Sequence, residues 1–410
     1  MKQAAIALAL LACFLLPAST QEQASSPATG FRLAGDLTAT LEASAREALY
    51  GPIEFGQVTA PSALHAVLSF ARGYRALGLL DFTFADSNLL ADVGGVPSLL
   101  EILSFDVNQF YADLNFGDLL YLRAGKQRLK WGAGWVFNPS DPVNPPKDPT
   151  EALQTNEGVP ALKAELITSV LSLALFSIFY ERPEDFGFGG KISSSALEGS
   201  DFSLSAYWSP AESWTAALNL SIAPLYFLPG WDTIQLWLEG GLYGEPRYPA
   251  LPPVAAPTGL QYSLLAGVSA TLPVVRTALL AEYYHLSEGL SAGEESTLFA
   301  ELRSTTDPTA LLAVLAQRPA RVGRDYAFLS VTQSSITDNG HPVFDHIGLS
   351  SSLLLNLTDL SLFVRHGIST TFVEDSALEL SVTWAAGGQD GEFANLAPAL
   401  SAELGLKIYY

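Results

Sequence analysis

The sequence predicts an all-β fold, a transmembrane antiparallel barrel of roughly 16 to 18 strands with short helices in its long external loops. Hydrophobic and polar residues alternate one by one in many segments of about nine to eleven residues, the length of a tilted strand that crosses a bilayer. Charged residues make up 15% of the chain and hydrophobic residues 49%. This is too little charge to cover a water-exposed surface of this size, so a lipid-facing surface is indicated.

A helical membrane protein is excluded by the length of the apolar runs. After the first 20 residues, no segment has the roughly 18 uninterrupted apolar residues that a spanning helix needs. The longest candidate, residues 166–180, is interrupted by threonine and serine. In lipid, only helices and closed barrels satisfy every backbone hydrogen bond, so a closed barrel is the remaining possibility.

The first 20 residues predict a secretory signal peptide. Lys2 precedes the apolar run 4–16, and small residues follow at 17–20. The only cysteine, Cys13, lies in this segment, so we expect no disulfide and no thiolate metal site in the mature chain. We expect a short N-terminal segment at 21–30 and a single barrel domain at 31–410. The predicted location is the outer membrane of a diderm bacterium, with outer-membrane lipid around the barrel.

The alternation identifies the strands in order. In the last one, Leu404, Leu406 and Ile408 share one face, whereas Glu403 and Lys407 share the other. The apolar face is assigned to lipid and the polar face to the lumen, because a soluble β-sandwich would carry charge on its outer face. The predicted strands are 33–41, 63–72, 77–86, 106–116, 118–127, 158–167, 171–181, 187–195, 202–208, 214–222, 233–242, 260–271, 275–285, 324–334, 345–355, 358–366, 378–384 and 400–410.

The connections alternate in length, which predicts the orientation of the barrel. Short links fall at 73–75, 116–117, 168–170 and 271–274, and long loops at 42–62, 87–105, 128–157, 244–258 and 286–323. Short turns are expected on the periplasmic side, together with both termini. Asp307 and Pro308 predict a helix start before 310–316, and Pro97 predicts another at 98–103. These helices either fold over the pore or form capped surface loops.

The residues on the predicted inner face are candidates to line the lumen. Charges of both signs across a channel orient polar solutes, whereas a ring of one sign selects ions. The alternative is that these charges only solvate the interior or pair with one another. The candidates are Asp81, Asp113, Lys163, Glu165, Glu239, Arg276, Glu282, Arg365, Glu379, Glu403 and Lys407.

Residues 125–149 form the most distinctive segment. Three cations fall within five residues of this acidic chain and are followed by two tryptophans and repeated Asn-Pro and Asp-Pro turns. Proline restricts its own backbone and that of its predecessor, so we expect a rigid loop that narrows the pore. We expect the cations to attract anions and the indoles to stack on the solute. The candidate constriction or solute-binding residues are Arg123, Lys126, Gln127, Arg128, Lys130, Trp131 and Trp135.

Two features of the sequence resemble known families. Gly125-x-Gln127-x-x-x-Trp131-Gly132, together with the Asn-Pro/Asp-Pro loop, resembles porin-like outer-membrane barrels, a group that includes alginate-export-type channels. The resemblance covers 120–149 and implies passive or facilitated passage of a solute, but it identifies no substrate. The terminal Tyr410, after alternating apolar residues, is similar to the signal that the barrel-assembly machinery reads.

These observations favour a porin-like channel for small polar or anionic solutes that needs no cofactor or metal. The net charge of −21 argues against nucleic-acid binding. Histidines 65, 285, 341, 346 and 366 are dispersed without metal-ligand spacing. Two alternatives remain: a plugged structural or adhesive barrel that acts through its external loops, and a barrel enzyme with a Ser–His pair at His65 or His285. Porins often form homo-oligomers, but nothing in the sequence marks an interface.

Overall fold

Eighteen strands form one antiparallel sheet in the part of the chain that the computed structural model describes. The described backbone covers residues 30–45, 54–69, 75–86, 103–116, 119–129, 131–141, 143–144, 158–180, 182–196, 198–210, 213–225, 227–228, 232–248, 250–255, 257–305, 309–315, 321–337, 340–341, 343–371, 376–397 and 399–409. Side chains are described from residue 110 onward within these ranges, except at 115, 309, 310, 313 and 407–409. The predicted signal peptide and Tyr410 lie outside the described residues.

All eighteen predicted strand positions are occupied by strands. The strands are β1 (Gly30–Ala45), β2 (Glu54–Ser69), β3 (Arg75–Asp86), β4 (Leu103–Phe116), β5 (Leu120–Gln127), β6 (Val159–Ile167), β7 (Leu171–Ile178), β8 (Gly187–Ser194), β9 (Ser200–Ser209), β10 (Ser213–Ile222), β11 (Gln235–Tyr243), β12 (Gln261–Leu272), β13 (Thr277–Leu286), β14 (Asp325–Gln333), β15 (Ile347–Asn356), β16 (Leu362–Thr370), β17 (Ser376–Ala386) and β18 (Leu400–Tyr409). The predicted loop 42–62 is too long, because β1 and β2 extend into it.

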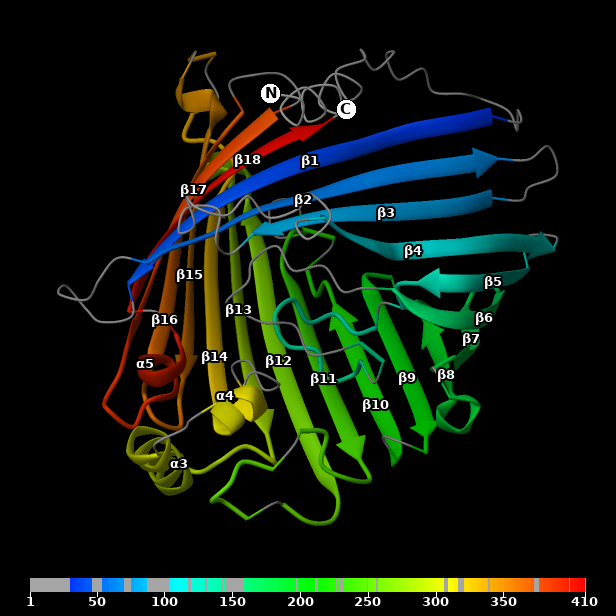
Figure 1. The fold of residues 1–410 in the computed structure, drawn as a ribbon. Coiled ribbons are helices and arrows are strands. Elements are labelled where there is room, and N and C mark those ends of the chain that lie inside the picture. The colour runs from blue at the N-terminus through cyan, green and yellow to red at the C-terminus, as the bar shows by residue number, and fades with distance from the viewer. Residues whose placement is uncertain are drawn as a thin grey trace.

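The sheet closes on itself. Every strand pairs with its neighbours in the sequence. The first strand, β1, also pairs with the last, β18, in a register that runs from Asp36↔Tyr409 to Ala45↔Leu400. Figure 1 shows β1 between β2 and β18. The fold is therefore a transmembrane antiparallel β-barrel, in which closure leaves no strand edge unpaired.

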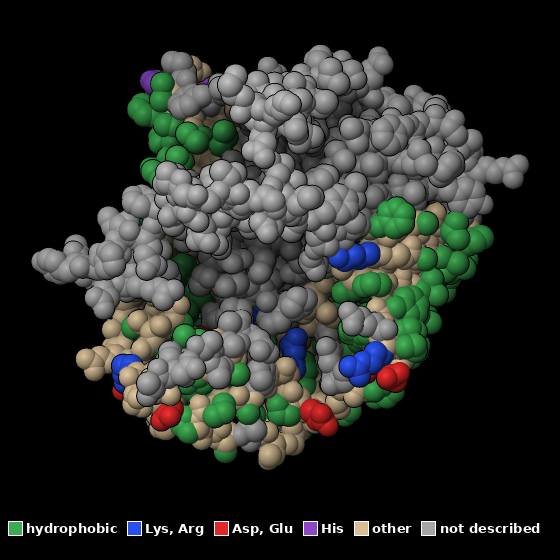
Figure 2. Space-filling model, in the orientation of Figure 1, with side chains coloured by type: hydrophobic (Ala, Val, Ile, Leu, Met, Phe, Trp, Pro, Cys, Tyr) green, Lys and Arg blue, Asp and Glu red, His purple; other side chains and the backbone are tan. Residues whose placement is uncertain are grey.

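The two faces of the wall differ as the alternation predicts. On β9, Phe202, Leu204 and Trp208 are exposed, whereas Ser203 and Tyr207 are buried. On β18, Leu404 and Leu406 are exposed, as predicted for residues that face lipid. Apolar side chains cover the outer surface over β5 to β8, at the right-hand edge of Figure 2. Such an apolar outer belt is what a bilayer requires of a barrel.

Short helices occur in the connections, and most lie at one end of the barrel (Figure 1). The predicted helix 310–316 is present as α4 (Thr309–Leu315), whereas the segment 98–102 lies outside the described residues. Two further helices, α3 (Ala292–Ser304) and α5 (Glu392–Leu396), were not predicted from the sequence. Single turns of 3-10 helix are η1 (Pro183–Asp185), η2 (Pro273–Val275) and η3 (Phe344–His346). No described helix is both long and apolar enough to cross a membrane.

Part of the barrel interior is packed with apolar side chains. Inward-facing residues of β11 to β16 form a buried cluster with Phe137 from the β5–β6 connection and Phe393 from α5. A polar lumen was expected along the whole wall, so this half of the interior differs from the prediction. The reason is that a loop and a helix pack against it and exclude water. The members from the wall are Trp237, Leu265, Tyr284, Leu286, Tyr326, Phe328, Leu354 and Phe363.

Candidate functional site

The chain that follows β5 folds into the barrel and packs against the opposite wall. We call the described residues from Leu129 to Asn144 the inward loop. Its Phe137 stacks on Tyr284 of β13, with 4.5 Å between ring centroids and 7° between the planes. The Tyr243 hydroxyl of β11 donates a 2.6 Å hydrogen bond to the Pro139 carbonyl oxygen. These contacts place the loop in the interior, as the sequence predicts for a loop that narrows the pore.

The residues before the prolines bind the backbone of the same loop. Asn138 donates to the Trp131 carbonyl, and Asn144 donates to the Leu129 carbonyl. The Asp141 carboxylate accepts the main-chain N–H groups of Val143 and Asn144 at 3.0 Å each. Burial raises the pKa of Asp141, although these hydrogen bonds favour its charged form. Side-chain caps on turn backbone of this kind make the loop rigid.

The motif residues at the start of the loop are structural. Gly125 has φ +131°, and a Cβ there would collide with the Phe110 carbonyl. Gln127 is 0% exposed and donates to the Ala161 carbonyl of β6 at 2.9 Å. Trp131 is 5% exposed and packs edge-on against Phe176. The expectation that Gln127 faces the solute is therefore wrong, because it is fully buried against the wall, whereas Trp131 is mostly buried but lines a cavity beside the loop.

The four predicted cations have different positions. Lys126 pairs with Phe110 and Pro160 in the ladders, and both of these partners are exposed on the outer face. Lys126 therefore points outward and not into the pore, since residues opposite each other share a face. Arg123 faces inward, where Asp113 accepts two hydrogen bonds from it at 2.6 and 2.8 Å. Lys130 lies outside the described residues.

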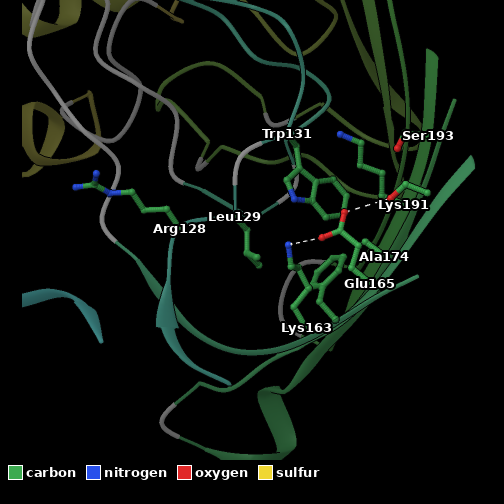
Figure 3. Close-up of a pocket in the computed structure, with 10 residues that line it drawn as sticks. Arg128, Leu129, Trp131, Lys163, Glu165, Ala174, Lys191 and Ser193 are labelled. Atoms are coloured by element: carbon green, nitrogen blue, oxygen red, sulfur yellow. Dashed lines mark hydrogen bonds and ion pairs between the residues drawn. The ribbon is translucent and has the colours of Figure 1, made fainter. Parts of the chain in front are cut away.

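Arg128 reaches the interior and lines a cavity of about 130 Å³ beside the inward loop. Figure 3 shows its guanidinium directed away from Trp131 and from the lysines on the wall. Trp135 is 64% exposed, and its own main-chain N–H is hydrogen-bonded to the wall. Of the two predicted stacking surfaces, Trp135 is the more exposed, whereas Trp131 is mostly buried and lines the cavity.

The cavity has a mixed polar and apolar lining with two lysines from the wall. Lys163 of β6 donates a 2.9 Å hydrogen bond to Glu165, which also accepts one from Ser172. Lys191 of β8 has its ammonium 5.9 Å from the ring centroid of Trp131 and makes no hydrogen bond or ion pair with any described residue. Figure 3 shows Lys191 above the Trp131 ring and Lys163 below it in this view. The complete lining is Arg128, Leu129, Trp131, Lys163, Glu165, Ser172, Ala174, Phe176, Lys191 and Ser193.

Lys191 was not among the predicted site residues. The sequence nevertheless contains a signal for it. In the predicted strand 187–195, Phe188 and Ile192 share the apolar outer face, and Lys191 has the opposite phase and so belongs to the inner face. In the predicted strand 118–127, Lys126 has the same phase as Leu120 and Leu122, which indicates the outer face.

The other predicted lumen charges are mostly paired or bound to the loop. Arg365 lies 3.1 Å from Glu403 and 3.8 Å from Glu379, all on the inner wall. Glu239 and Glu282 bind the backbone of the inward loop. Arg276 is in the turn before β13 and donates to Ser335, so the expectation that it lines the wall is wrong. The side chains of Asp81 and Lys407 lie outside the described residues.

The described cavity is lined by no histidine, and the described pairs that contain a histidine lie elsewhere. Ser351 and His366 are 3.1 Å apart, but this pair is exposed and lies outside the cavity. His285 and Asp325 form a pair at 2.8 Å, also outside the cavity. His65 has no described side chain. Within the described residues, no group of three or more His, Cys, Asp or Glu side chains is arranged to hold a metal ion.

The fold is similar to several solved outer-membrane barrels at very low sequence identity. OccAB1 of Acinetobacter baumannii has a TM-score of 0.59 and 11% identity, over 96% of this chain and 99% of that one. A BenF-like porin of Pseudomonas fluorescens Pf-5 has a TM-score of 0.55 and 10% identity, with coverage of 93% and 98%. Wzi of Escherichia coli is an outer-membrane protein described as a carbohydrate-binding β-barrel. It has a TM-score of 0.51 and 10% identity, over 93% of this chain and 85% of that one. No family model and no curated protein sequence matches the chain. These likenesses support the porin-like barrel fold.

Proposed function

We propose that this protein is an outer-membrane channel for the diffusion of small polar or anionic solutes. The observation that supports this most directly is the inward loop, which forms a cavity with the lysine-bearing wall of β6 to β8. One of the similar barrels is named a porin, and the outer apolar belt suits a bilayer. A passage on the β6–β8 side is consistent with the packed interior on the β11–β16 side.

The proposed preference for anions follows from local charge. The chain as a whole is strongly acidic, with a net charge of −21. At the cavity, by contrast, the two wall lysines Lys163 and Lys191 face one carboxylate, Glu165. Lys163 is largely neutralised by that carboxylate at 2.9 Å. Lys191 is therefore the cation we assign to attract the solute, because its ammonium has no described anion in contact.

Planar-bilayer recordings in a salt gradient test the proposal. We expect wild-type channels to conduct, and Lys191→Gln to shift the reversal potential toward cation selectivity. Salt near 0.1 M is suitable, because charges interact over a Debye length of about 10 Å there. Lys126→Gln is the matched control, since it removes the same charge from the outward face. A purified barrel without conductance, or equal shifts for the two variants, would contradict the proposal.

A plugged barrel that binds a ligand through its loops is the second candidate. It is favoured by an apolar core that α3 and α4 form with nearby loops. This core includes Leu251, Leu298, Phe299, Leu315 and Val322. One similar barrel, Wzi, is described as carbohydrate-binding. The same recordings separate the two candidates, because a plugged barrel gives folded protein without conductance.

A further inference from the structure

We propose that Glu239 on β11 and Glu282 on β13 are positioning residues that hold the inward loop in the lumen and thereby set the width of the passage. The inference rests on the proposed function, because it assigns the loop to the path of the solute. The two carboxylates come from strands that flank β12 and face the interior together. Both side chains are almost completely buried, at 0% and 3% exposure.

Glu239 binds the two ends of the loop segment 133–140. One oxygen accepts the main-chain N–H groups of Ala133 and Gly134, the latter at 2.6 Å. The other accepts the Ser140 hydroxyl at 2.7 Å and the Ser140 N–H at 3.3 Å. Gly132 leaves room for this carboxylate, because a Cβ there would collide with Glu239, Asn138 and Ser140.

Glu282 binds the residues between these ends. It accepts the N–H groups of Trp135, Val136 and Phe137 at 2.7, 3.0 and 3.4 Å. The Trp237 indole on β11 donates a further hydrogen bond to it at 3.2 Å. Gly267 on β12 lets this indole lie against the wall, since a Cβ at Gly267 would overlap the ring. Five consecutive N–H groups of the loop, 133–137, thus end on two wall carboxylates.

Only an acceptor fits this arrangement. All eight partners of the two side chains are donors, and an ionised carboxylate offers acceptors alone. Hydrogen bonds to a charged group are stronger than neutral ones, and the loop N–H groups would be costly to leave unpaired in the interior. A glutamine of the same shape would direct an NH₂ group at these N–H donors, so it would retain the volume while losing half of the binding.

The wall does not need these side chains in order to close. The ladders of β11 with β10 and β12, and of β13 with β12 and β14, run through backbone groups along their full length. We therefore expect the loss of either carboxylate to release the loop and leave the barrel intact. This separates a positioning role from a role in folding.

Spin labelling and conductance together test the inference in the full-length protein in lipid. A cysteine introduced as Trp135→Cys would be the only thiol outside the predicted leader, and the native side chain there is exposed. Glu239→Gln, Glu282→Gln and the double variant are compared in this background. Each change should raise the ratio of released to docked loop by about tenfold or more, since a hydrogen bond to a charged group is worth that much. We expect a more mobile label, and larger, noisier channels.

Glu379→Gln is the matched control, because it removes a glutamate from the inner wall that pairs with Arg365 and not with the loop. It should leave the label as immobile as in wild type, and its effect on conductance measures the loss of charge alone. If the double variant does not fold, Ser140→Ala removes a single donor from Glu239 and should mobilise the label to a smaller extent. An unchanged label in a folded double variant, or in Ser140→Ala, overturns the inference. A wild-type barrel that does not conduct contradicts the proposed function, while the label still reports the position of the loop.

Discussion

At the scale of single residues, the inward loop depends on a few positions where only one kind of side chain fits. Gly132 has φ +78° and lies against the Glu239 carboxylate. Gln127 and Asn144 use side-chain amides to bind buried carbonyl groups. The motif that resembles porin-like barrels is therefore conspicuous because it builds the loop, and its Gln127 does not line the cavity.

Gly132→Ala tests this residue-scale account. Gly340 is the matched control, because it has the same φ of +78° but open space around its Cα. Gly340→Ala should cost about 1 kcal/mol of backbone strain, whereas Gly132→Ala should cost about 2 kcal/mol more through its clash with Glu239. Thermal unfolding followed by circular dichroism in detergent measures both variants. Equal losses of stability would show that the contact with Glu239 is unimportant.

At the scale of elements, α3 and α5 meet the barrel at a buried cluster of carboxyl groups. The Asn356 amide nitrogen lies 2.9 Å from Glu295 of α3, 2.9 Å from Glu392 of α5 and 3.1 Å from Asp359. Three carboxyl groups crowd this one amide nitrogen, and repulsion among them favours a proton on one of the three. The Tyr326 hydroxyl donates to Glu392 at 2.6 Å and is the remaining titratable group that faces the cluster among the described residues.

This cluster predicts that the docking of α3 depends on pH. Burial raises the pKa of Glu295 to about 9 and that of Glu392 to about 7. An undocked carboxyl releases its proton near its ordinary pKa, whereas the docked one retains it. Docking should therefore be strongest below about pH 4.5 and weaken as pH rises toward about 9. Hydrogen exchange of the α3 amides, corrected for the intrinsic rate, should show protection falling over this range.

Glu295→Gln should flatten this dependence, because it keeps a neutral group at the cluster. Glu294→Gln is the control on the same helix. Hydrogen bonds from Ser291 lower the pKa of Glu294, so its stabilising effect is lost only as pH falls below the ordinary range. The Glu294 variant should weaken α3 but keep the slope above pH 5. If the protection of the α3 amides in wild type does not change with pH, Glu295 does not control the docking of α3.

At the scale of the whole molecule, the barrel is defined by the difference between its two faces. Leu204 is 50% exposed at the middle of β9, where it pairs with Leu218 and Ile192 on the outer surface. Ser205, the next residue, pairs with Lys191 on the inner face. A charge has different surroundings at these two adjacent positions, namely lipid at one and the polar interior at the other.

Leu204→Arg and Ser205→Arg therefore form a matched pair. Leu204→Arg should destabilise the barrel in lipid vesicles, lowering its free energy of unfolding by about 2 to 4 kcal/mol, the cost of arginine near the bilayer midplane. Ser205→Arg should cost much less, since the inner face is polar there. Urea titrations of the two variants in vesicles measure the difference. Equal costs would mean that the outer face of β9 does not contact lipid.

The sequence by itself determined the architecture and the two faces of the wall. Successive residues of a strand point to opposite sides, so the alternation at Leu404, Glu403 and their neighbours was sufficient to place them. It also predicted a rigid loop after β5, because Asn-Pro and Asp-Pro turns have local causes. Alternation along a strand was also enough to place Lys163 and Glu165 on the inner face.

Only the tertiary structure decided what the inward loop binds and that Lys191 lies beside a cavity. The main-chain N–H of Phe137 reaches Glu282, which is 145 residues away in the sequence, and no local pattern encodes such a contact. Beyond Gln127 the chain has no period of two, so the direction of each loop side chain depends on the wall that it packs against. For this reason the burial of Trp131 was not readable from the sequence, whereas Lys126 and Lys191 lie on strands, where alternation places them on the outer and inner face.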